Sequence, residues 1–357
     1  MTAWNRARNR FDDIYIMKNF LKILHIDEYS LTPYYRQLCN AILQGINDKL
    51  IDDNDVLPSI NDLSIALDVS RNIVTKAYNT LKQSGVVSSV PGKGYFISNT
   101  NINRSIKVLL LFNKLSSPKK MIYDSFAESL GDSASIDFFI YNSSLSFLKK
   151  ILADKIDRYD KIVIIPHFVD NGEEPFQVIN QIPKEKLVLV GKLVDGVDGK
   201  FAAVYEDFEN DIYNSLVELL PQVKLYNSLA IVFPKNSYYS TDILMGFLNF
   251  CKKYNCDYEI IPDLKNENIS KNSLYITLTE NDLVELVGKL LSNQLVLKED
   301  IGIISYNETP LKRFILNGIT TISADFDFMG KKAAELVLSN IAEQIKVPFN
   351  TIVRPSI

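Results

Sequence analysis

Arg71, Asn72, Thr75 and Lys76 are the residues whose types and spacing best suit a chemical task. They share one side of a helix predicted to follow Ser70, because the apolar residues of this segment recur every three to four positions and occupy the other side. Arginine and asparagine can each form two hydrogen bonds with one base in the major groove. Serine, threonine and lysine suit the neighbouring phosphates. The segment is therefore predicted to be a helix that reads DNA.

Neighbouring elements are expected to hold this helix against DNA. A scaffold helix is predicted to begin at Pro33, since proline suits the first helical position. A shorter helix follows Ser59, which stands three residues before an acid in the capping-box spacing. After Gly85, two short apolar runs joined by glycines predict a hairpin with Lys93 at its tip. This order of elements is typical of a winged helix-turn-helix; the competing interpretation is a helical cap with a hairpin and solvated charges.

The charges near the predicted reading helix are placed unevenly. The whole chain has a formal net charge of −4, which gives no general attraction to nucleic acid. Within residues 31–98 the basic and acidic residues balance, but no acid occurs between Asp68 and Asp124. The helix and the hairpin therefore present a basic, one-sided surface, and its modest charge favours binding as a dimer.

The segments YYRQLCNAILQGI, LPSINDLSIALDVSRNIVTKAYNTLKQSGVV and PGKGYFIS closely resemble the winged helix of GntR-type regulators. The resemblance implies double-stranded operator DNA as a partner. In one departure, Asn61 stands where that family usually carries an arginine, which changes one expected DNA contact. The residues expected to contact DNA are Ser59, Asn61, Ser70, Arg71, Asn72, Thr75, Lys76, Gly92, Lys93 and Gly94.

The remainder of the chain alternates apolar runs with amphipathic helical patterns. A leader is expected over residues 1–30, the winged helix over 31–98, a polar linker over 99–105 and a second domain over 106–357; Met17 is an alternative start. Apolar strands between helices predict parallel sheets that are buried on both faces. The strands are expected at 106–112, 136–141, 161–166, 187–190, 201–205, 228–233, 258–261, 274–278 and 301–306. The length suits two doubly wound lobes.

Ligands of such sheets bind beyond the carboxyl ends of the strands. Polar and aromatic residues at those ends suit a sugar, because amide and carboxylate groups bond its hydroxyls while a ring covers its apolar face. Asp242 and Asp282 have the alternative of capping the helices that they begin. The residues expected to bind the effector are Asn113, Tyr141, Asn142, His167, Lys192, Tyr238, Asp242, Glu280, Asn281, Asp282 and Asn307.

The C-terminal segment LKEDIGIISYNETPLKRFILNGITTISADFDFMGKKAAELVLSNI, followed by TIVRPS, resembles the end of the LacI/GalR-type effector domain. This resemblance implies a two-lobed fold of the periplasmic-binding-protein type I class. It also implies that Asn307 grips a sugar hydroxyl. Lys192 falls where that family often has a basic residue after an aspartate, but in this chain the preceding residue is Gly191. Ile243 stands where many members have a ligand-binding arginine. That replacement argues against a strongly anionic ligand.

Other function classes find little support in the sequence. Three cysteines and two histidines predict neither a disulfide framework nor a metal site, and the apolar runs are too short to span a membrane. No phosphate loop or nucleophile elbow is present, so no enzyme activity and no cofactor are expected. A cytoplasmic location is expected from the same features.

The sequence thus predicts an α/β protein with an N-terminal winged helix-turn-helix and a two-lobed effector domain. The expected function is that of a homodimeric repressor of a carbohydrate-utilisation operon, whose operator affinity is changed by a neutral monosaccharide in the cleft between the lobes. The alternatives are a regulator that senses a sugar phosphate or another small metabolite, and an α/β enzyme fused to a winged helix.

Overall fold

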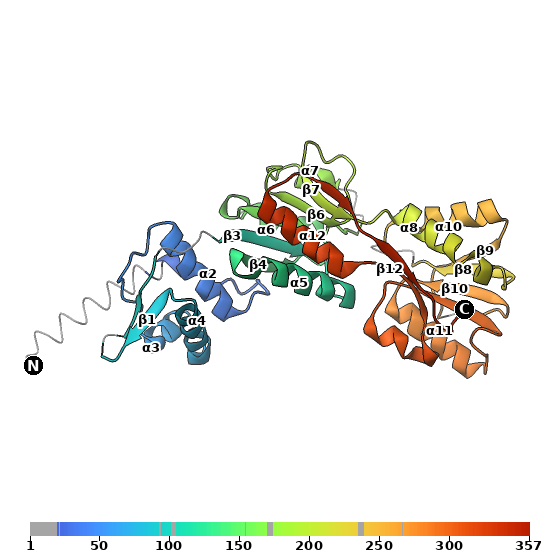
Figure 1. Ribbon diagram of the computed structural model, residues 1–357, viewed down its shortest axis with the longest axis horizontal. Coiled ribbons are helices and arrows are strands. Elements are labelled where there is room, and N and C mark those ends of the chain that lie inside the picture. Colours follow the sequence, from blue (N-terminus) through green and yellow to red (C-terminus); the bar gives the residue numbers. More distant parts are fainter. Residues whose placement is uncertain are drawn as a thin grey trace, which may run out of the picture. The chain divides into compact units, whose positions relative to one another are not determined.

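The computed structural model describes residues 20, 22–92, 94–100, 105–153, 155–169, 174–234, 239–265 and 267–357 (Figure 1). They form two compact units. The first comprises the described residues up to Leu111 with Gly131–Ile140 and Arg158–Asp160, and the second comprises the rest. No helix among the described residues is long and apolar enough to cross a membrane.

The first unit begins with three helices and a hairpin in the predicted order. These are α2 (Tyr34–Asn47), α3 (Ile60–Ala66), α4 (Arg71–Gln83), β1 (Val87–Val90) and β2 (Gly94–Ile97), and β1 pairs antiparallel with β2. The elements lie within residues 31–98, although the exact domain limits stay a prediction.

The apolar side of α4 faces the core of this small domain. Val74, Ala77, Tyr78 and Leu81 are all buried, at the spacing of one helical stripe. The hydroxyl of Tyr78 donates a hydrogen bond of 2.8 Å to the carbonyl oxygen of Pro58, which satisfies its only buried polar group. Because this side is fixed in the core, the opposite side of α4 faces outward.

The segment before α2 lies along β4 (Ala134–Ile140), which belongs to the same compact unit. The amide of Leu31 donates a hydrogen bond of 2.7 Å to the carbonyl of Phe138, and the amide of Phe138 donates one of 2.9 Å to Oγ1 of Thr32. Gln37 of α2 holds the segment by donating a bond of 2.8 Å to the carbonyl of Thr32. Since β4 ends its sheet, the segment covers backbone groups that would otherwise lack a partner strand.

Two six-stranded sheets form the framework of the remaining chain, with the orders β13-β7-β6-β5-β3-β4 and β14-β12-β11-β10-β8-β9. The first contains β3 (Ile106–Phe112), β4, β5 (Lys161–Ile164), β6 (Leu187–Gly191), β7 (Ala202–Tyr205) and β13 (Gln344–Lys346). The second contains β8 (Ser228–Val232), β9 (Asp257–Ile261), β10 (Ser273–Thr277), β11 (Ile301–Tyr306), β12 (Thr320–Ala324) and β14 (Phe349–Ile352).

Both sheets are built mainly from parallel pairs, and β14 pairs antiparallel with β12. The helices between the strands are α5 (Ser117–Leu130), α6 (Leu145–Ala153), α7 (Pro175–Ile179), α8 (Phe208–Glu218), α9 (Leu220–Val223), α10 (Thr241–Tyr254), α11 (Glu280–Ser292) and α12 (Phe326–Ser339). Short 3-10 turns occupy Gly131–Ser133, Ile156–Arg158, Pro310–Arg313 and Ile315–Asn317. The predicted α/β fold is confirmed.

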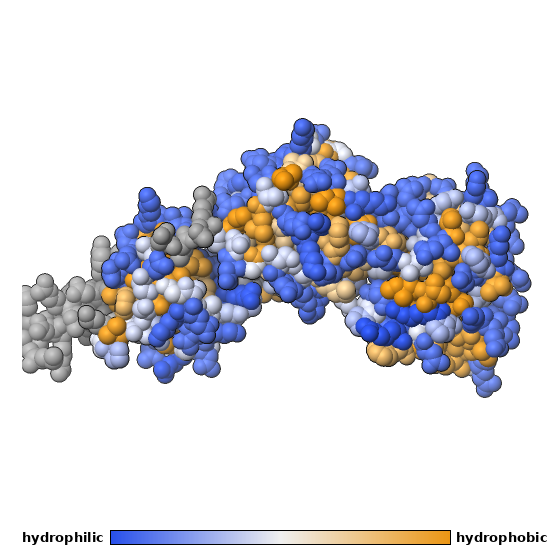
Figure 2. Space-filling model, in the orientation of Figure 1, coloured by the Kyte–Doolittle hydropathy of each residue, from blue (hydrophilic) through white to orange (hydrophobic). Residues whose placement is uncertain are grey.

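Apolar side chains form the core on the faces of both sheets. All five residues of β6 and all six of β11 are buried, as expected for strands covered on both faces. The face in Figure 2 shows hydrophilic residues over much of the surface, interrupted by separate apolar patches.

In the described part of the chain, three segments cross between the two six-stranded sheets. They follow β7, precede α12 and join β13 to β14. The amide of Val347 donates a hydrogen bond of 2.9 Å to the carbonyl of Tyr205, and the amide of Asp325 donates one of 2.9 Å to the carbonyl of Pro348. Lys346 also bridges the carboxylates of Asp207 and Asp211 at 2.9 and 3.1 Å. These contacts tie the crossing segments together.

Candidate effector pocket and DNA-binding helix

The outward side of α4 carries the predicted reading residues. Arg71, Asn72 and Lys76 are exposed, and the hydroxyl of Thr75 donates a hydrogen bond of 2.8 Å to the carbonyl of Arg71. The ammonium of Lys76 lies 3.9 Å from the centre of the Tyr35 ring, which orients the long lysine side chain. The structure thus places these side chains together on one accessible helical face.

The other predicted DNA contacts lie on neighbouring elements. Ser59 caps α3, because its hydroxyl accepts a hydrogen bond of 3.2 Å from the amide of Asp62. Asn61 is exposed in the first turn of α3, and Ser70 occupies the N-cap position of α4 without a capping bond from its side chain. Gly92 and Gly94 both have a positive φ, +83° and +82°, which a tight turn requires. Lys93 lies outside the described residues.

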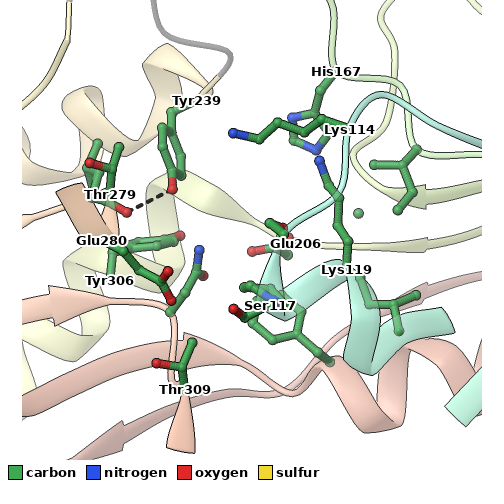
Figure 3. A pocket seen from close by; sticks show the side chains of 18 of the residues that line it. Lys114, Ser117, Lys119, His167, Glu206, Tyr239, Thr279, Glu280, Tyr306 and Thr309 are labelled. Carbon is green, nitrogen blue, oxygen red and sulfur yellow. Dashed lines mark hydrogen bonds between the residues drawn. The ribbon is translucent and has the colours of Figure 1, made fainter. Parts of the chain in front are cut away.

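A cavity of about 410 Å³ occupies the second unit where strands of both sheets reach their carboxyl ends (Figure 3). Its volume is within the range of small-molecule sites. The loop after β3 and the amino end of α5 contribute residues 114–119, and the ends of β5, β7, β10 and β11 contribute His167, Glu206, Thr279 and Asn307. This is the place that parallel sheets favour for ligands.

One side of the cavity carries nitrogen-bearing side chains. Figure 3 shows Lys114, Lys119 and His167 on that side, with Glu206 between them and the opposite wall. Lys119 is 8% exposed and donates a hydrogen bond to Oδ1 of Asn113. Its burial lowers the pKa of Lys119 to about 7, a shift to which the charge of Lys114 adds and which Glu206 opposes.

Glu206 is the acid at the centre of this arrangement. Burial raises the pKa of Glu206 to about 8; the charge of Asp211 adds to the shift and Lys119 opposes it. The pKa values of Lys119 and Glu206 therefore shift toward each other, because burial disfavours the charged form of both residues.

Two tyrosines face the nitrogen-bearing side from the opposite wall (Figure 3). The hydroxyl of Tyr239 donates a hydrogen bond of 2.7 Å to the carbonyl of Leu278, and the ring centres of Tyr239 and Tyr306 lie 6.4 Å apart at 78°. Tyr306 is 1% exposed, and its hydroxyl has no hydrogen-bond partner among the residues that the structure describes. An unsatisfied buried hydroxyl costs about 1–3 kcal/mol, so a ligand that pairs with it recovers that free energy.

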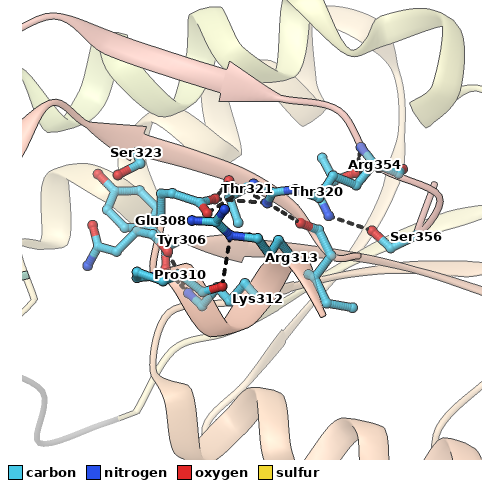
Figure 4. A network of polar contacts seen from close by, with 12 residues as sticks. Tyr306, Glu308, Pro310, Lys312, Arg313, Thr320, Thr321, Ser323, Arg354 and Ser356 are labelled. Atoms are coloured by element: carbon cyan, nitrogen blue, oxygen red, sulfur yellow. Dashed lines mark hydrogen bonds and ion pairs between the residues drawn. The ribbon is translucent and has the colours of Figure 1, made fainter. Parts of the chain in front are cut away.

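A polar network fixes the loop that carries Asn307 (Figure 4). The buried ammonium of Lys312 donates hydrogen bonds to the carbonyls of Tyr306 and Asn307, at 2.9 and 2.5 Å. Burial lowers the pKa of Lys312 to about 8, although Glu280 and Glu308 oppose the shift. Asn307 itself adopts a positive φ of 67°. Lys312 thus holds the backbone of the loop in which Asn307 has this left-handed conformation.

Four of the predicted effector residues line the cavity: His167, Glu280, Asn281 and Asn307. Six others lie outside its lining: Asn113, Tyr141, Asn142, Lys192, Asp242 and Asp282. Tyr238 lies outside the described residues. The assignment of individual residues to the effector stays a prediction.

The structure gives several of these six residues other contacts. Tyr141 is buried, and its hydroxyl donates 2.6 Å and 3.2 Å bonds to the carbonyls of Ile165 and His167. Asn113 is buried beside Lys119 and donates a bond of 3.0 Å to Ser143. Asp242 accepts a hydrogen bond from Ser240 at the start of α10. Asp282 completes a capping box with Thr279 at the start of α11. These contacts orient the loops beside the cavity.

Sequence reasoning missed Lys114, Lys119, Glu206 and Tyr306. Glu206 and Lys114 closely follow predicted strands, so the rule that selected Asn307 could have found both. Lys119 lies in the first turn of α5, where the sequence carries no distinct signal. Ile243 in place of a ligand-binding arginine argued against a strongly anionic ligand, but the structure brings two other cationic side chains, Lys114 and Lys119, to one wall of the cavity.

The described residues contain no group of three or more His, Cys, Asp or Glu residues that could hold a metal ion. The cavity's chemistry is that of hydrogen bonds, charge and aromatic faces. It suits reversible binding of a small polar molecule.

Residues 34–97 match the family model "Bacterial regulatory proteins, gntR family". The transcriptional repressor YtrA of Bacillus subtilis (strain 168) is 27% identical over 100 residues, which are 28% of this chain and 73% of YtrA. The uncharacterised regulator YhdI of the same organism is 39% identical over 71 residues, which are 20% of this chain and only 15% of YhdI.

Several solved structures share the fold of the larger part. The trehalose repressor from Escherichia coli matches with a TM-score of 0.59 and 16% identity, over 70% of this chain and all of that chain. The Lac repressor bound to ONPG matches with a TM-score of 0.60 and 13% identity, over 81% of this chain and 92% of that one. A LacI-type regulator from Alkaliphilus metalliredigens complexed with D-xylulofuranose has a TM-score of 0.57 and 13% identity, over 71% of this chain and 99% of that one.

These sequence identities are too low to infer the ligand of this protein from those structures, but the shared fold covers the part of the chain that holds the cavity. The gntR match covers α2, α3, α4 and both hairpin strands. The protein is thus a transcriptional regulator in which a gntR-family winged helix-turn-helix, residues 34–97, is joined to a domain with the fold of LacI-type regulators.

Proposed function

We propose that the protein is a homodimeric repressor of a carbohydrate-utilisation operon, and that a sugar bound in the cavity changes its affinity for operator DNA. One observation carries the proposal: the same chain presents an accessible polar face on α4 and a polar cavity at the carboxyl ends of two parallel sheets. The first is a DNA-reading surface and the second a small-molecule site.

The DNA half of the proposal rests on the side chains of α4. Arg71 and Asn72 stand in its first turn, from which recognition helices reach base edges. Thr75 and Lys76 lie on the same face and suit phosphates. One winged helix with few cations binds DNA weakly, so two copies reading a near-palindrome are needed for specific binding.

The effector half rests on the chemistry of the cavity wall. Asn307 and Glu206 offer hydrogen-bonding groups at fixed strand ends, and Tyr306 offers a buried hydroxyl without a partner. A sugar presents several hydroxyls to such groups and an apolar face to the tyrosine rings. The names of the similar structures, a trehalose repressor and a regulator complexed with D-xylulofuranose, support a sugar.

Coupling between the two sites requires a modest free energy. A ligand that contacts both six-stranded sheets favours one arrangement of the crossing segments. The linker then passes that preference to the spacing of the two DNA-binding domains. A coupling of about 1–3 kcal/mol changes operator affinity by roughly 5- to 150-fold.

Operator binding tests the proposal directly. Selection of the full-length protein on a random duplex pool yields the operator, and fluorescence anisotropy then gives its affinity with and without sugars. Arg71→Ala is expected to lose about 1–3 kcal/mol of specific binding, the value of a bidentate base contact. The control, Lys253→Ala, removes a positive charge from exposed α10 and leaves operator binding unchanged.

Two results would contradict separate parts of the proposal. Unchanged operator affinity in Arg71→Ala removes Arg71 from the base-reading set. An operator affinity that no sugar alters refutes the sugar-responsive mechanism, even when DNA binding itself is specific.

A further inference from the structure

The amino end of α5 is built into the cavity wall. Residues 115–119 all line the cavity, together with Lys114 just before them. The first backbone amides of a helix have no partner within the helix and carry a partial positive charge. In α5, a helix of 14 residues, this end adds partial positive charge beside Lys114 and Lys119, although Pro118 in its first turn has no N–H to donate. The wall combines two ammonium groups with the positive end of a helix.

Lys114 and Lys119 repel each other when both are charged. The charge of Lys114 contributes to the lowered pKa of Lys119, after the larger effect of burial. Glu206 opposes this shift, while burial raises its own pKa to about 8. A bound anion favours the charged form of a buried lysine, because it offsets both the lost hydration and the repulsion from a neighbouring lysine.

Tyr306 provides an independent sign that the cavity receives a polar ligand. Tyr306 lines the cavity, and its buried hydroxyl has no hydrogen-bond partner in the described part of the chain. Tyr306 faces the cavity from the side opposite the lysines, and Glu206 lies between the two sides (Figure 3). A ligand that spans the cavity can therefore place hydroxyls there and a different group against the lysines.

We propose that the effector is a sugar derivative with an anionic group, a carboxylate or a phosphate, which binds between Lys114, Lys119 and the amino end of α5. The sugar part of this statement rests on the proposed function, whereas the anion subsite rests on the wall itself. An anion between the lysines relieves their repulsion and accepts hydrogen bonds from both ammonium groups and the helix amides. The hydroxyls of the same molecule face Tyr306 and Glu206.

Matched ligands provide the test on the full-length protein. Melting temperature and calorimetric titration are measured with D-glucose, D-glucuronate, D-glucose 6-phosphate and the matching galactose series. Inorganic phosphate and acetate probe the subsite alone. The acidic members are expected to bind and to raise the melting temperature, while their neutral parents bind at least about tenfold more weakly, as the loss of a charged hydrogen bond implies. The acetate, uronate and phosphate arms distinguish a carboxylate from a phosphate.

Three lysine variants locate the anion. Lys114→Gln and Lys119→Met are each expected to weaken binding of the acidic probes by about 10-fold or more. Lys114 is only half-buried, so its variant folds even if the buried Lys119 does not tolerate methionine. The matched control is Lys120→Gln, an exposed neighbour on α5 that pairs with Asp124 and does not line the cavity. It retains the affinity of the unaltered protein.

The outcomes separate this inference from the proposed function. Neutral sugars that bind as well as their acids, or acids whose affinity Lys114→Gln leaves unchanged, overturn the anion subsite, as does a failure of every acidic probe to bind. If a neutral sugar nevertheless changes operator affinity, sugar regulation stands without the anion. If acidic probes bind in a Lys114-dependent way but no sugar derivative changes operator affinity, the subsite stands and the sugar-responsive function fails.

Discussion

Arg354 and Glu308 form a two-pronged ion pair, with Nη1 2.9 Å from Oε2 and Nη2 2.9 Å from Oε1. Arg354 follows β14 near the end of the chain, and Glu308 directly follows Asn307 of the cavity wall. Although burial opposes the shift, the hydrogen bonds from Arg354 and Thr321 hold the pKa of Glu308 below its usual range. The segment that follows β14 thus fixes the position of a loop that lines the cavity.

Arg354→Lys tests this role. A lysine cannot reproduce two parallel hydrogen bonds, so the free energy of unfolding is expected to fall by about 1–3 kcal/mol in urea denaturation. Effector affinity is expected to fall as well, because Asn307 loses its support. The control is Arg313→Lys on the exposed 3-10 turn, whose arginine contacts Phe314 and the carbonyl of Pro310. Equal losses in both variants would show that the pairing has no special role.

Tyr306→Phe separates stability from binding. Removing a buried hydroxyl that has no partner is expected to leave the unliganded protein as stable as before, or up to about 1–3 kcal/mol more stable. The same change is expected to weaken effector binding if the ligand supplies the missing partner. Thermal melting and titration of one protein sample check both parts. A loss of stability without loss of affinity would show that the hydroxyl serves the fold.

The sequence predicted strands that are buried along their whole length, such as β6 and β11, and also the more exposed edge strands β4 and β9. The predicted limits of β3 and β11 are those of the structure, and the other predicted strands differ from it by a few residues at their ends. Reasoning from periodicity missed β12, where Thr320 and Thr321 are fully buried. Their burial depends on partners far along the chain: Thr320 bonds to the backbone of Arg354 and to Ser356. A local pattern cannot reveal such partners.

The site was predictable where a residue directly follows a strand. His167, Glu280, Asn281 and Asn307 meet at the cavity because carboxyl ends of parallel strands share one edge of each sheet. The same rule also includes Glu206, which directly follows β7. Asp282 instead caps its own helix, and no sequence pattern distinguishes a cap from a ligand contact at that position. Lys119 reaches the cavity only through the packing of α5.

Glu206→Gln is expected to change how stability depends on pH. Burial and the charge of Asp211 raise the pKa of Glu206 on folding, and the charge of Lys119 opposes this shift. A carboxyl group with a raised pKa contributes its full stabilisation below its unfolded pKa. That stabilisation is lost as the pH rises from about 4.5 toward about 8. The variant lacks this loss, so its melting temperature relative to the unaltered protein is expected to increase between pH 5 and pH 8.

Glu209→Gln is the control for that experiment, because Glu209 is an exposed acid near the start of α8 that bonds to Asn249. Its difference from the unaltered protein is expected to stay constant over the same pH range. A constant difference for Glu206→Gln would mean that its carboxyl group titrates alike in the folded and unfolded chains.

Gly246 and Gly288 predict opposite effects of the same substitution. A Cβ at Gly246 of α10 would lie 2.1 Å from the backbone oxygen of Glu209 and 2.6 Å from Cγ2 of Ile212, so alanine must separate α10 from α8. We expect a loss of about 1–3 kcal/mol in the free energy of unfolding.

Gly288 of α11 has nothing within 4 Å of its Cβ position, and alanine there is expected to add about 0.5–1 kcal/mol through helix propensity. Urea denaturation of both variants measures the two signs, and a stabilised Gly246→Ala would contradict the close approach of α8 to α10.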